Sequence, residues 1–153
     1  MRNVIFDIDG TIADCNHRRH HVDGSGPVDW NAFRAETVND TPNQHVCDMA
    51  IQHVANGDNV IFVTARNNSE REVTMSQIRE WIGIENPILF MRPDGDYRPD
   101  EIFKRDILEF LRQEDALGQD PDVVYDDRNK VVDMWIENGI NCIQVVNRAD
   151  GNF

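Results

Sequence analysis

The chain has 153 residues, of which 40% are hydrophobic and 28% charged, and it carries a formal net charge of −13 at pH 7. This length suits one domain with a sizeable core and is too short for two substantial ones, so we predict a single domain spanning residues 1–153. The acidic charge repels polyanions, which argues against an extended nucleic-acid-binding groove. No apolar run approaches the length of a membrane span, and the first residues lack the apolar core of a signal peptide, so we expect a cytoplasmic chain with no membrane partner.

The first predicted strand is a short apolar run, residues 4–6, that ends abruptly in two acidic residues, Asp7 and Asp9. A run of this kind is typical of a strand buried on both faces of a sheet. Two carboxylates this close raise each other's pKa, and holding them beside an apolar core requires a compensating cation or a charged substrate. The stretch therefore indicates either an acidic strand end that caps a turn or a site that binds a metal and a substrate.

The stretch after this strand, residues 14–40, is polar and punctuated by glycine and proline, with one short helix indicated around Trp30 and Phe33. We interpret it as a small cap-like insertion, about residues 15–40, that covers the mouth of the first strand. Three histidines in it could line a substrate pocket, be solvated or bind zinc: His17, His20 and His21. Because no cysteine or acidic partner stands at a suitable spacing, zinc is the weakest of these interpretations.

Strand and helix patterns alternate along the rest of the chain. Further strands are predicted at residues 60–63, 88–91, 122–125 and 142–146. Helical patterns lie between them, with these residues as predicted caps: Thr41 with Gln44, Ser69 with Glu72, and Asp100. The alternation predicts an α/β fold, a Rossmann-like parallel sheet of five strands with helices on both faces and a small insertion after the first strand.

Polar residues follow the predicted strands at the edge where ligands bind in such sheets. They are Asp7 and Asp9 after the first strand, Thr64 and Arg66 after the second, Lys104 on the helix after the third, and Asp126 and Asp127 after the fourth. Carboxylates from two strand ends form a hard-oxygen site suited to Mg²⁺, and a hydroxyl with two cations suits a phosphate. This combination is what phosphoryl transfer requires, because the protein mainly positions groups and stabilises charge.

The string Phe-Asp-Ile-Asp-Gly-Thr at residues 6–11 resembles motif I of the haloacid-dehalogenase (HAD) superfamily of phosphotransferases, in which apolar residues precede Asp-x-Asp-Gly-Thr. The resemblance implies that Asp7 is a nucleophile forming an aspartyl-phosphate and that Asp9 protonates the leaving oxygen and later activates water. It also implies that Thr64 holds a phosphate oxygen and that Lys104 neutralises the nucleophile and the phosphate.

The same resemblance implies a Mg²⁺ site. Asp126 and Asp127 match the acidic pair of motif IV, which holds the metal together with the Asp7 carboxylate and the Asp9 carbonyl. The pair could alternatively cap the helix that follows it. Its position after a strand, in order with the other motifs, favours the metal site.

Within the superfamily the chain is most similar to the 3′-phosphatase domain of phage-type polynucleotide kinase/phosphatase. The residues that carry this likeness are the opening string, Arg18, Thr64-Ala65-Arg66, Gly95-Asp96-Tyr97-Arg98 with Lys104, and the segments 126–135 and 138–146. The likeness implies substrate-binding roles for Arg18, Arg66 and Asp96, beside Gly10 and Thr11 of the opening string. The family usually has Ser-Gly-Arg where this chain has Thr-Ala-Arg, and no Gly-x-x-x-x-Gly-Lys-Ser/Thr is present, so no kinase half is expected.

Three functional hypotheses follow. The first is a Mg²⁺-dependent phosphomonoesterase that hydrolyses 3′-phosphates of nucleotides or nucleic-acid ends. The second is a 5′-deoxynucleotidase or another small-metabolite phosphatase on the same fold, which the acidic charge favours. The third is a non-catalytic nucleotide-binding regulatory module, which would have no need of both a nucleophile and an acid/base residue. The sequence does not set the oligomeric state.

Overall fold

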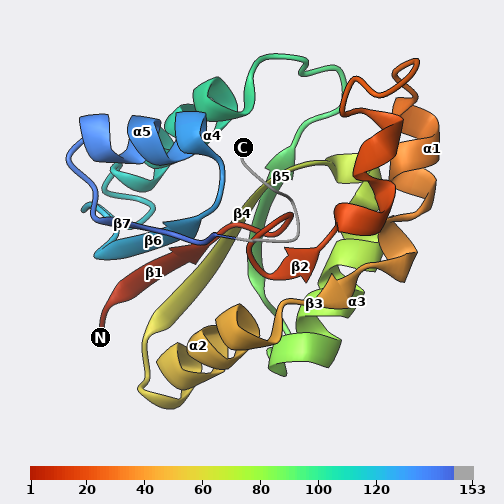
Figure 1. Ribbon diagram of the computed structural model, residues 1–153. Helices are drawn as coiled ribbons and strands as arrows, with labels where there is room; N and C mark the ends of the chain where they lie inside the picture. Colours follow the sequence, from red (N-terminus) through yellow and green to blue (C-terminus); the bar gives the residue numbers. More distant parts are fainter. Residues whose placement is uncertain (147–153) are drawn as a thin grey trace.

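A computed structural model describes residues 1–146. Its main sheet has five strands in the order β5-β4-β1-β6-β7, and each pair of neighbouring strands is parallel (Figure 1). The strands are β1 (Asn3–Phe6), β4 (Asn59–Asn67), β5 (Ile88–Arg92), β6 (Val123–Asp126) and β7 (Cys142–Gln144). The central strand, β1, has one polar residue, Asn3, followed by three apolar ones, and all four are buried. The predicted α/β fold with a parallel sheet is confirmed.

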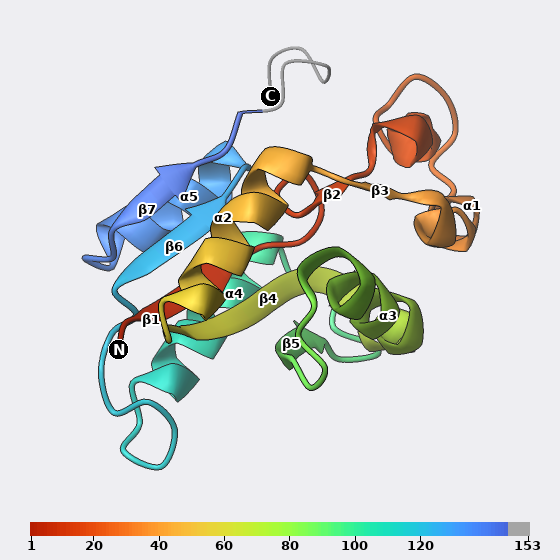
Figure 2. The same ribbon diagram turned by 90° about the horizontal axis from the view of Figure 1, so that it is seen from below.

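Helices cover both faces of the sheet (Figure 2). They are α2 (Gln44–Ala55) and α3 (Arg71–Ile82) on one face and α4 (Asp100–Leu111) and α5 (Asn129–Glu137) on the other. The central strand serves both cores, because Val4 and Phe6 pack with α2 and α3 while Ile5 packs with α4 and α5. This alternation follows from the two-residue period of a strand. Because β1 is the central strand, its end lies in the middle of the edge formed by the carboxyl ends of the strands.

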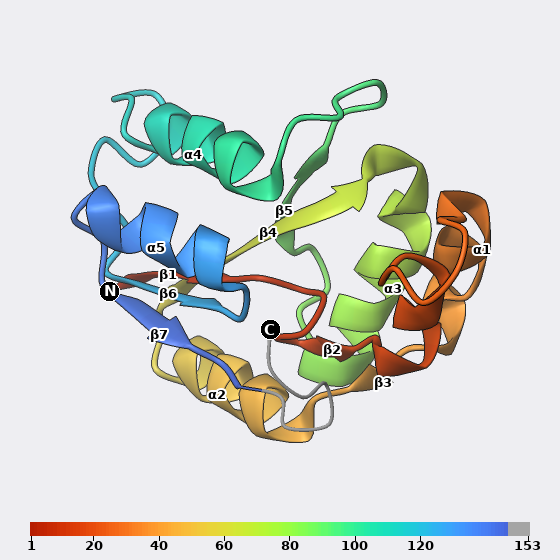
Figure 3. The same cartoon turned by 45° about the horizontal axis from the view of Figure 1, so that its top comes forward.

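The insertion after β1 packs beside α3 at that edge (Figure 3). It contains η1 (Asn16–His21), α1 (Trp30–Ala35) and η2 (Thr37–Asn39), and its two ends, β2 (Ala13–Asp14) and β3 (Thr41–Pro42), pair antiparallel. Thr37 fixes it to α3 and the preceding turn, since its hydroxyl donates to Glu70 at 2.7 Å and its carbonyl accepts from Gln77 at 2.8 Å. The insertion therefore lies along one side of the carboxyl edge of the sheet and has no hydrophobic core of its own.

None of the three predicted helix caps forms as predicted. Thr41 is extended in β3, and α2 begins after Asn43, because pairing with Asp14 takes precedence over the capping pattern. The capping box before α3 is made by Asn67 and Glu70 around η3 (Asn68–Glu70) instead of by Ser69 and Glu72. Asp100 is the first residue of α4 and follows Pro99 at the cap position.

Within residues 1–146, no helix combines the length and the apolar character needed to cross a bilayer. Cys15, Cys47 and Cys142 are all free thiols.

Candidate active site

The turn after β1 brings its carboxylates close to those that follow β6. Residues 8–13 close on themselves through hydrogen bonds from the Thr11 and Ala13 amides to the Ile8 carbonyl. Gly10 has φ +83°, and a Cβ on it would lie 2.1 Å from Asp127 Oδ2. Only glycine accommodates both the left-handed backbone and this approach, so its role here is to let the two loops meet.

Three buried aspartates form a cluster at the centre of the edge. Ligand atoms of Asp7, Asp126 and Asp127 lie within 4.8 Å of one another. Lys104 Nζ donates to Asp7 Oδ1 at 2.7 Å and to Asp126 Oδ2 at 2.8 Å. The Thr11 hydroxyl donates to Asp7 Oδ2 at 3.0 Å. Both carboxylate oxygens of Asp7 therefore accept a hydrogen bond, one from Lys104 and the other from the Thr11 hydroxyl.

The charges in this cluster do not balance. Burial, with repulsion from Asp126, raises the pKa of Asp7 well above its usual value although Lys104 opposes it. Burial and Asp126 likewise raise the pKa of Asp127 to about 6. Burial lowers the pKa of Lys104, but attraction to Asp126 and Asp7 outweighs it and raises that pKa, so the lysine stays charged. One ammonium thus faces three carboxylates in a buried space.

These residues fit a divalent cation such as Mg²⁺. Both Asp127 carboxylate oxygens are buried and have no hydrogen-bond partner among residues 1–146, although water or a ligand normally satisfies such atoms. The Asp126 oxygens are already engaged, Oδ1 by the Asp127 amide and Oδ2 by Lys104 and Trp135 Nε1. We therefore expect the Asp127 oxygens to hold the ion directly, with Asp7 and Asp126, whose oxygens already accept hydrogen bonds, beside it.

In the absence of divalent ions, we expect the stability of the folded chain to fall as pH rises from about 4 to above 6. The pKa of Asp127 is about 6 in the folded chain and about 3.9 in an unfolded one, so within this window the native state binds more protons and deprotonation favours unfolding. Thermal melts in chelator should show a lower midpoint at neutral than at mildly acidic pH, and added Mg²⁺ should raise the midpoint most at neutral pH. Asp127→Asn should flatten both trends, and an equal Mg²⁺ effect in that variant would contradict the assignment.

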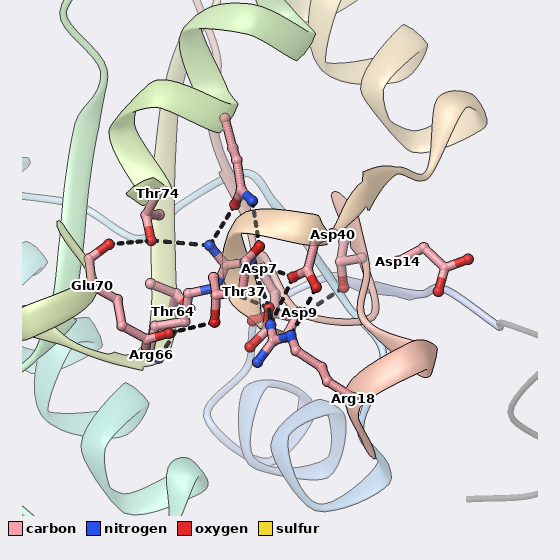
Figure 4. Close-up of polar contacts among 12 residues, drawn as sticks. Asp7, Asp9, Asp14, Arg18, Thr37, Asp40, Thr64, Arg66, Glu70 and Thr74 are labelled. Atoms are coloured by element: carbon pink, nitrogen blue, oxygen red, sulfur yellow. Dashed lines mark hydrogen bonds and ion pairs between the residues drawn. The ribbon is translucent and has the colours of Figure 1, made fainter. Parts of the chain in front are cut away.

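A second network of polar contacts holds the Asp9 carboxylate (Figure 4). Asp9 Oδ1 accepts from Arg18 Nη2 and from Arg66 Nε, both at 2.9 Å. Both guanidinium groups also donate to Asp40, with Arg18 Nη2 at 2.7 Å and Arg66 Nη2 at 2.9 Å from Oδ2. Arg66 Nη1 reaches Thr74 and Gln77 on α3. The insertion, β4 and α3 thus orient the Asp9 carboxylate together.

The arginines keep Asp9 ionised. Burial raises its pKa, but Arg66 and Arg18 outweigh burial and hold the pKa below its usual value. The Arg18 guanidinium also lies 4.2 Å from the centre of the Phe33 ring, and its Nη1 is buried without a hydrogen-bond partner among the described residues. Asp7 and Asp9 are therefore neighbours in opposite environments.

Sequence reasoning missed Asp40, which anchors this network with a fully buried side chain. Nothing in the sequence around it marks a site, since it stands between the insertion and β3 without a motif. His17 Nε2 lies 2.7 Å from Asp40 Oδ1, whereas His21 faces Glu36 and contacts the His20 ring at a tilt of 40°. The three histidines form no metal-ligand cluster within residues 1–146.

Two further predicted site residues are Thr64 and Asp96. Thr64 is buried in β4, beside the central strand, and its hydroxyl accepts from the Arg66 amide at 3.1 Å. Asp96 lies in the loop between β5 and α4, where its carboxylate binds Arg98 at 2.9 Å. No contact of Asp96 within the described part of the chain reaches the aspartate cluster, so its substrate-binding role stays a prediction.

Comparisons with known proteins identify the family of this chain. A family model described as the polynucleotide kinase PNKP phosphatase domain matches residues 1–153. Two chains from structures of the Pnkp1/Rnl/Hen1 RNA repair complex are 31% and 33% identical, with TM-scores of 0.73 and 0.70. The matches cover 94% of this chain but only 42% and 45% of those chains.

More distant structures share the fold. A class C acid phosphatase from Bacillus anthracis with tungstate bound is 13% identical, with a TM-score of 0.64 over 100% of this chain and 74% of that one. At that identity the likeness concerns the fold alone. The match of the family model over the whole sequence, together with the identity above 30%, shows that the chain belongs to the HAD phosphatases of the PNKP phosphatase-domain family.

Proposed function

We propose that this chain is a Mg²⁺-dependent phosphomonoesterase that removes 3′-phosphates from nucleotides or nucleic-acid ends through an aspartyl-phosphate on Asp7. The observation that carries the proposal is the contrast between two adjacent carboxylates. Asp7 is fixed by Lys104 and Thr11 beside the unpaired oxygens of Asp127. Asp9 is fixed by two arginines. Such a pair suits a nucleophile and an acid/base residue.

In the first step an Asp7 oxygen attacks phosphorus, and the bond between phosphorus and the ester oxygen breaks. Asp9 gives its proton to the leaving oxygen, which departs as an alcohol. Lys104, 2.7 Å from Asp7 Oδ1, offsets the negative charge where nucleophile and phosphate meet. The Thr64 hydroxyl is our candidate for holding a phosphate oxygen. Mg²⁺, when bound, supplies further positive charge to this region.

In the second step water attacks the phosphorus of the aspartyl-phosphate, and Asp9 takes a proton from that water. The bond to Asp7 breaks and inorganic phosphate leaves. The ionised state that Arg66 and Arg18 favour for Asp9 suits this second role. A dianionic phosphate nearby raises the pKa of a carboxyl group, so we expect Asp9 to take up the proton needed for the first step when substrate binds.

Family membership and the matched relatives support a 3′-phosphorylated substrate. The matched relatives come from structures of an RNA repair complex. The net charge of −13 opposes a long polyanion, so we propose that recognition is confined to the terminal one or two nucleotides. The alternative is a 5′-deoxynucleotidase, which would have the same HAD fold.

The test is phosphate release from matched 3′- and 5′-phosphorylated mononucleotides and from short and long 3′-phosphorylated oligonucleotides, with Mg²⁺ and with chelator. We expect Mg²⁺-dependent release from the 3′ substrates with similar efficiency at every length. A salt titration should give a slope for about one to three ionic contacts, because a long groove would engage six or more. Preference for 5′-mononucleotides would replace the substrate assignment and leave the catalytic residues in place, and activity in chelator equal to that with Mg²⁺ would refute the metal dependence.

A further inference from the structure

We infer that His17 is a positioning residue: it holds the Asp40 carboxylate in place, and through Asp40 it fixes the two arginines that orient Asp9. The inference rests on the proposed acid/base role of Asp9 and deepens it, because it extends the catalytic arrangement to a residue on the surface of the insertion. The sequence leaves a substrate pocket, solvation and zinc as interpretations of the insertion histidines. The contacts of His17 indicate a different role, as the outer end of a chain of contacts that leads to Asp9.

The Asp40 carboxylate is shared by three side chains. Its Oδ1 lies 2.7 Å from His17 Nε2 and accepts from Arg18 Nε at 2.8 Å. Its Oδ2 accepts from Arg18 Nη2 at 2.7 Å and from Arg66 Nη2 at 2.9 Å. Because the carboxylate is the acceptor for both guanidinium groups, we assign the histidine ring as the donor in its own contact. His17 therefore limits rotation of the carboxylate at the oxygen that Arg66 does not contact.

His17 is the solvent-facing end of this chain of contacts. Its side chain is 38% exposed, whereas the side chains of Asp40, Arg18 and Arg66 are 0%, 0% and 1% exposed. A hydrogen bond to a buried carboxylate is strong because little water competes for the acceptor. Without the histidine donor, Oδ1 loses one of its two partners, and the carboxylate can turn. That rotation moves Oδ2 relative to both guanidinium groups.

The two arginines carry this constraint to Asp9. Arg18 Nη2 and Arg66 Nε both donate to Asp9 Oδ1 at 2.9 Å. Because a guanidinium is a rigid plane, a shift of the part that binds Asp40 also shifts the part that binds Asp9. Arg66 Nη1 donates in addition to two side chains of α3, so we expect a change of orientation and not a collapse of the network. A misdirected carboxylate is a poorer acid/base group, since proton transfer needs hydrogen-bond geometry.

The insertion contains a matched control for His17. His21 lies on the same short helix, η1, and its Nε2 lies 3.0 Å from Glu36 Oε2. Like His17, it joins η1 to a carboxylate in the later part of the insertion. Within residues 1–146, the Glu36 carboxylate forms an ion pair with His21 and with neither arginine of the network. Loss of either histidine thus removes one contact across the insertion, but only the contact of His17 leads to Asp9.

The first measurement needs no turnover. It follows hydrogen exchange of the Arg66 Nε–H, which donates to Asp9, by NMR in the whole chain. We expect His17→Leu to speed this exchange about tenfold, as weakening of a buried hydrogen bond does. We expect His21→Leu to exchange as the wild type, and His17→Gln, which keeps a donor, to stay close to it. Unchanged exchange in His17→Leu would overturn the inference, and so would equal acceleration in His21→Leu, the result of a purely structural contact.

The second measurement compares kcat/KM for a 3′-nucleotide and for an aryl phosphate, p-nitrophenyl phosphate. This ratio reports the steps up to release of the alcohol. The alcohol of a nucleotide needs a proton from Asp9 to leave, whereas a nitrophenolate leaves without one. We expect His17→Leu to lower kcat/KM about tenfold for the nucleotide and less for the aryl ester, and His17→Gln to restore most of the loss. Equal losses on both esters would contradict a role in orienting Asp9.

The two measurements separate the inference from the proposed function. Accelerated Arg66 Nε–H exchange in His17→Leu, with no hydrolysis of 3′-phosphates by the wild type, refutes the proposed function and supports the role of His17. Hydrolysis of 3′-phosphates by the wild type, with unchanged exchange and unchanged kcat/KM in His17→Leu, refutes only the role of His17.

Discussion

Asp7→Asn should abolish phosphate release, with a loss on the order of 10⁴-fold or more. An amide has nearly the shape of a carboxylate but is a poor nucleophile, and it forms no stable phosphate ester. The fold should survive, because Asp7 lies against Asp126 and Asp127 and its removal relieves repulsion among buried like charges. Turnover in Mg²⁺ and a thermal melt in chelator measure the two halves of this prediction.

The matched control for Asp7→Asn is Asp14→Asn. Asp14 stands in β2, close in sequence, and within residues 1–146 its carboxylate accepts a hydrogen bond only from the Asn16 amide. We expect Asp14→Asn to keep wild-type activity. Retention of near-wild-type turnover by Asp7→Asn would rule out the covalent mechanism, whereas an unfolded Asp7→Asn chain would mean that the carboxylate supports the fold.

Asp40→Asn should destabilise the chain by about 3–5 kcal/mol, the cost typical of removing one partner from a buried charge network. The Asp40 carboxylate is the shared acceptor for Arg18, Arg66 and His17. Without it two buried guanidinium groups keep only Asp9 as a carboxylate partner. Turnover should fall as well, because the two arginines that orient Asp9 lose the carboxylate that anchors them. Urea unfolding followed by circular dichroism gives the stability change.

Asp48→Asn is the control for this second change, since Asp48 is exposed on α2 and contacts Gln44. A surface substitution of this kind should stay within about 0.5 kcal/mol of the wild type. If Asp40→Asn were as stable as Asp48→Asn, Asp40 would not anchor the arginines. A stable but inactive Asp40→Asn would instead assign Asp40 to orientation alone.

The sheet could be predicted from the sequence because each strand carries its own signal. The apolar residues of β1 and the alternation of strand and helix depend on local patterns, and right-handed crossovers then place Asp7 and Asp126 at one edge. Lys104 was predicted in the same way, and it contacts both carboxylates. Those parts of the site follow from topology once the strands are known.

The arginine network could not be predicted, because its contacts join segments that are remote in sequence and have no shared pattern. A motif marks Arg18 and Arg66 without stating which carboxylates bind them. Their partner Asp40 becomes visible only when the insertion packs on α3 through Thr37. The false cap at Thr41 has the same origin, since a tertiary strand pairing overrode a local preference.

The attachment of the insertion has a consequence for the native-state dynamics of this protein. Three features hold the insertion against the rest of the domain: the hydrogen bond of Thr37, the pairing of β2 with β3, and the contacts of Asp40. A local opening of this segment would detach Arg18 from Asp9 while the five-stranded sheet stays intact. The fraction of molecules competent for catalysis is then set by the free energy of that sub-global opening and not by global unfolding. Amide hydrogen exchange in η1 would report it directly, so two chains of equal melting temperature could differ in activity through this one equilibrium.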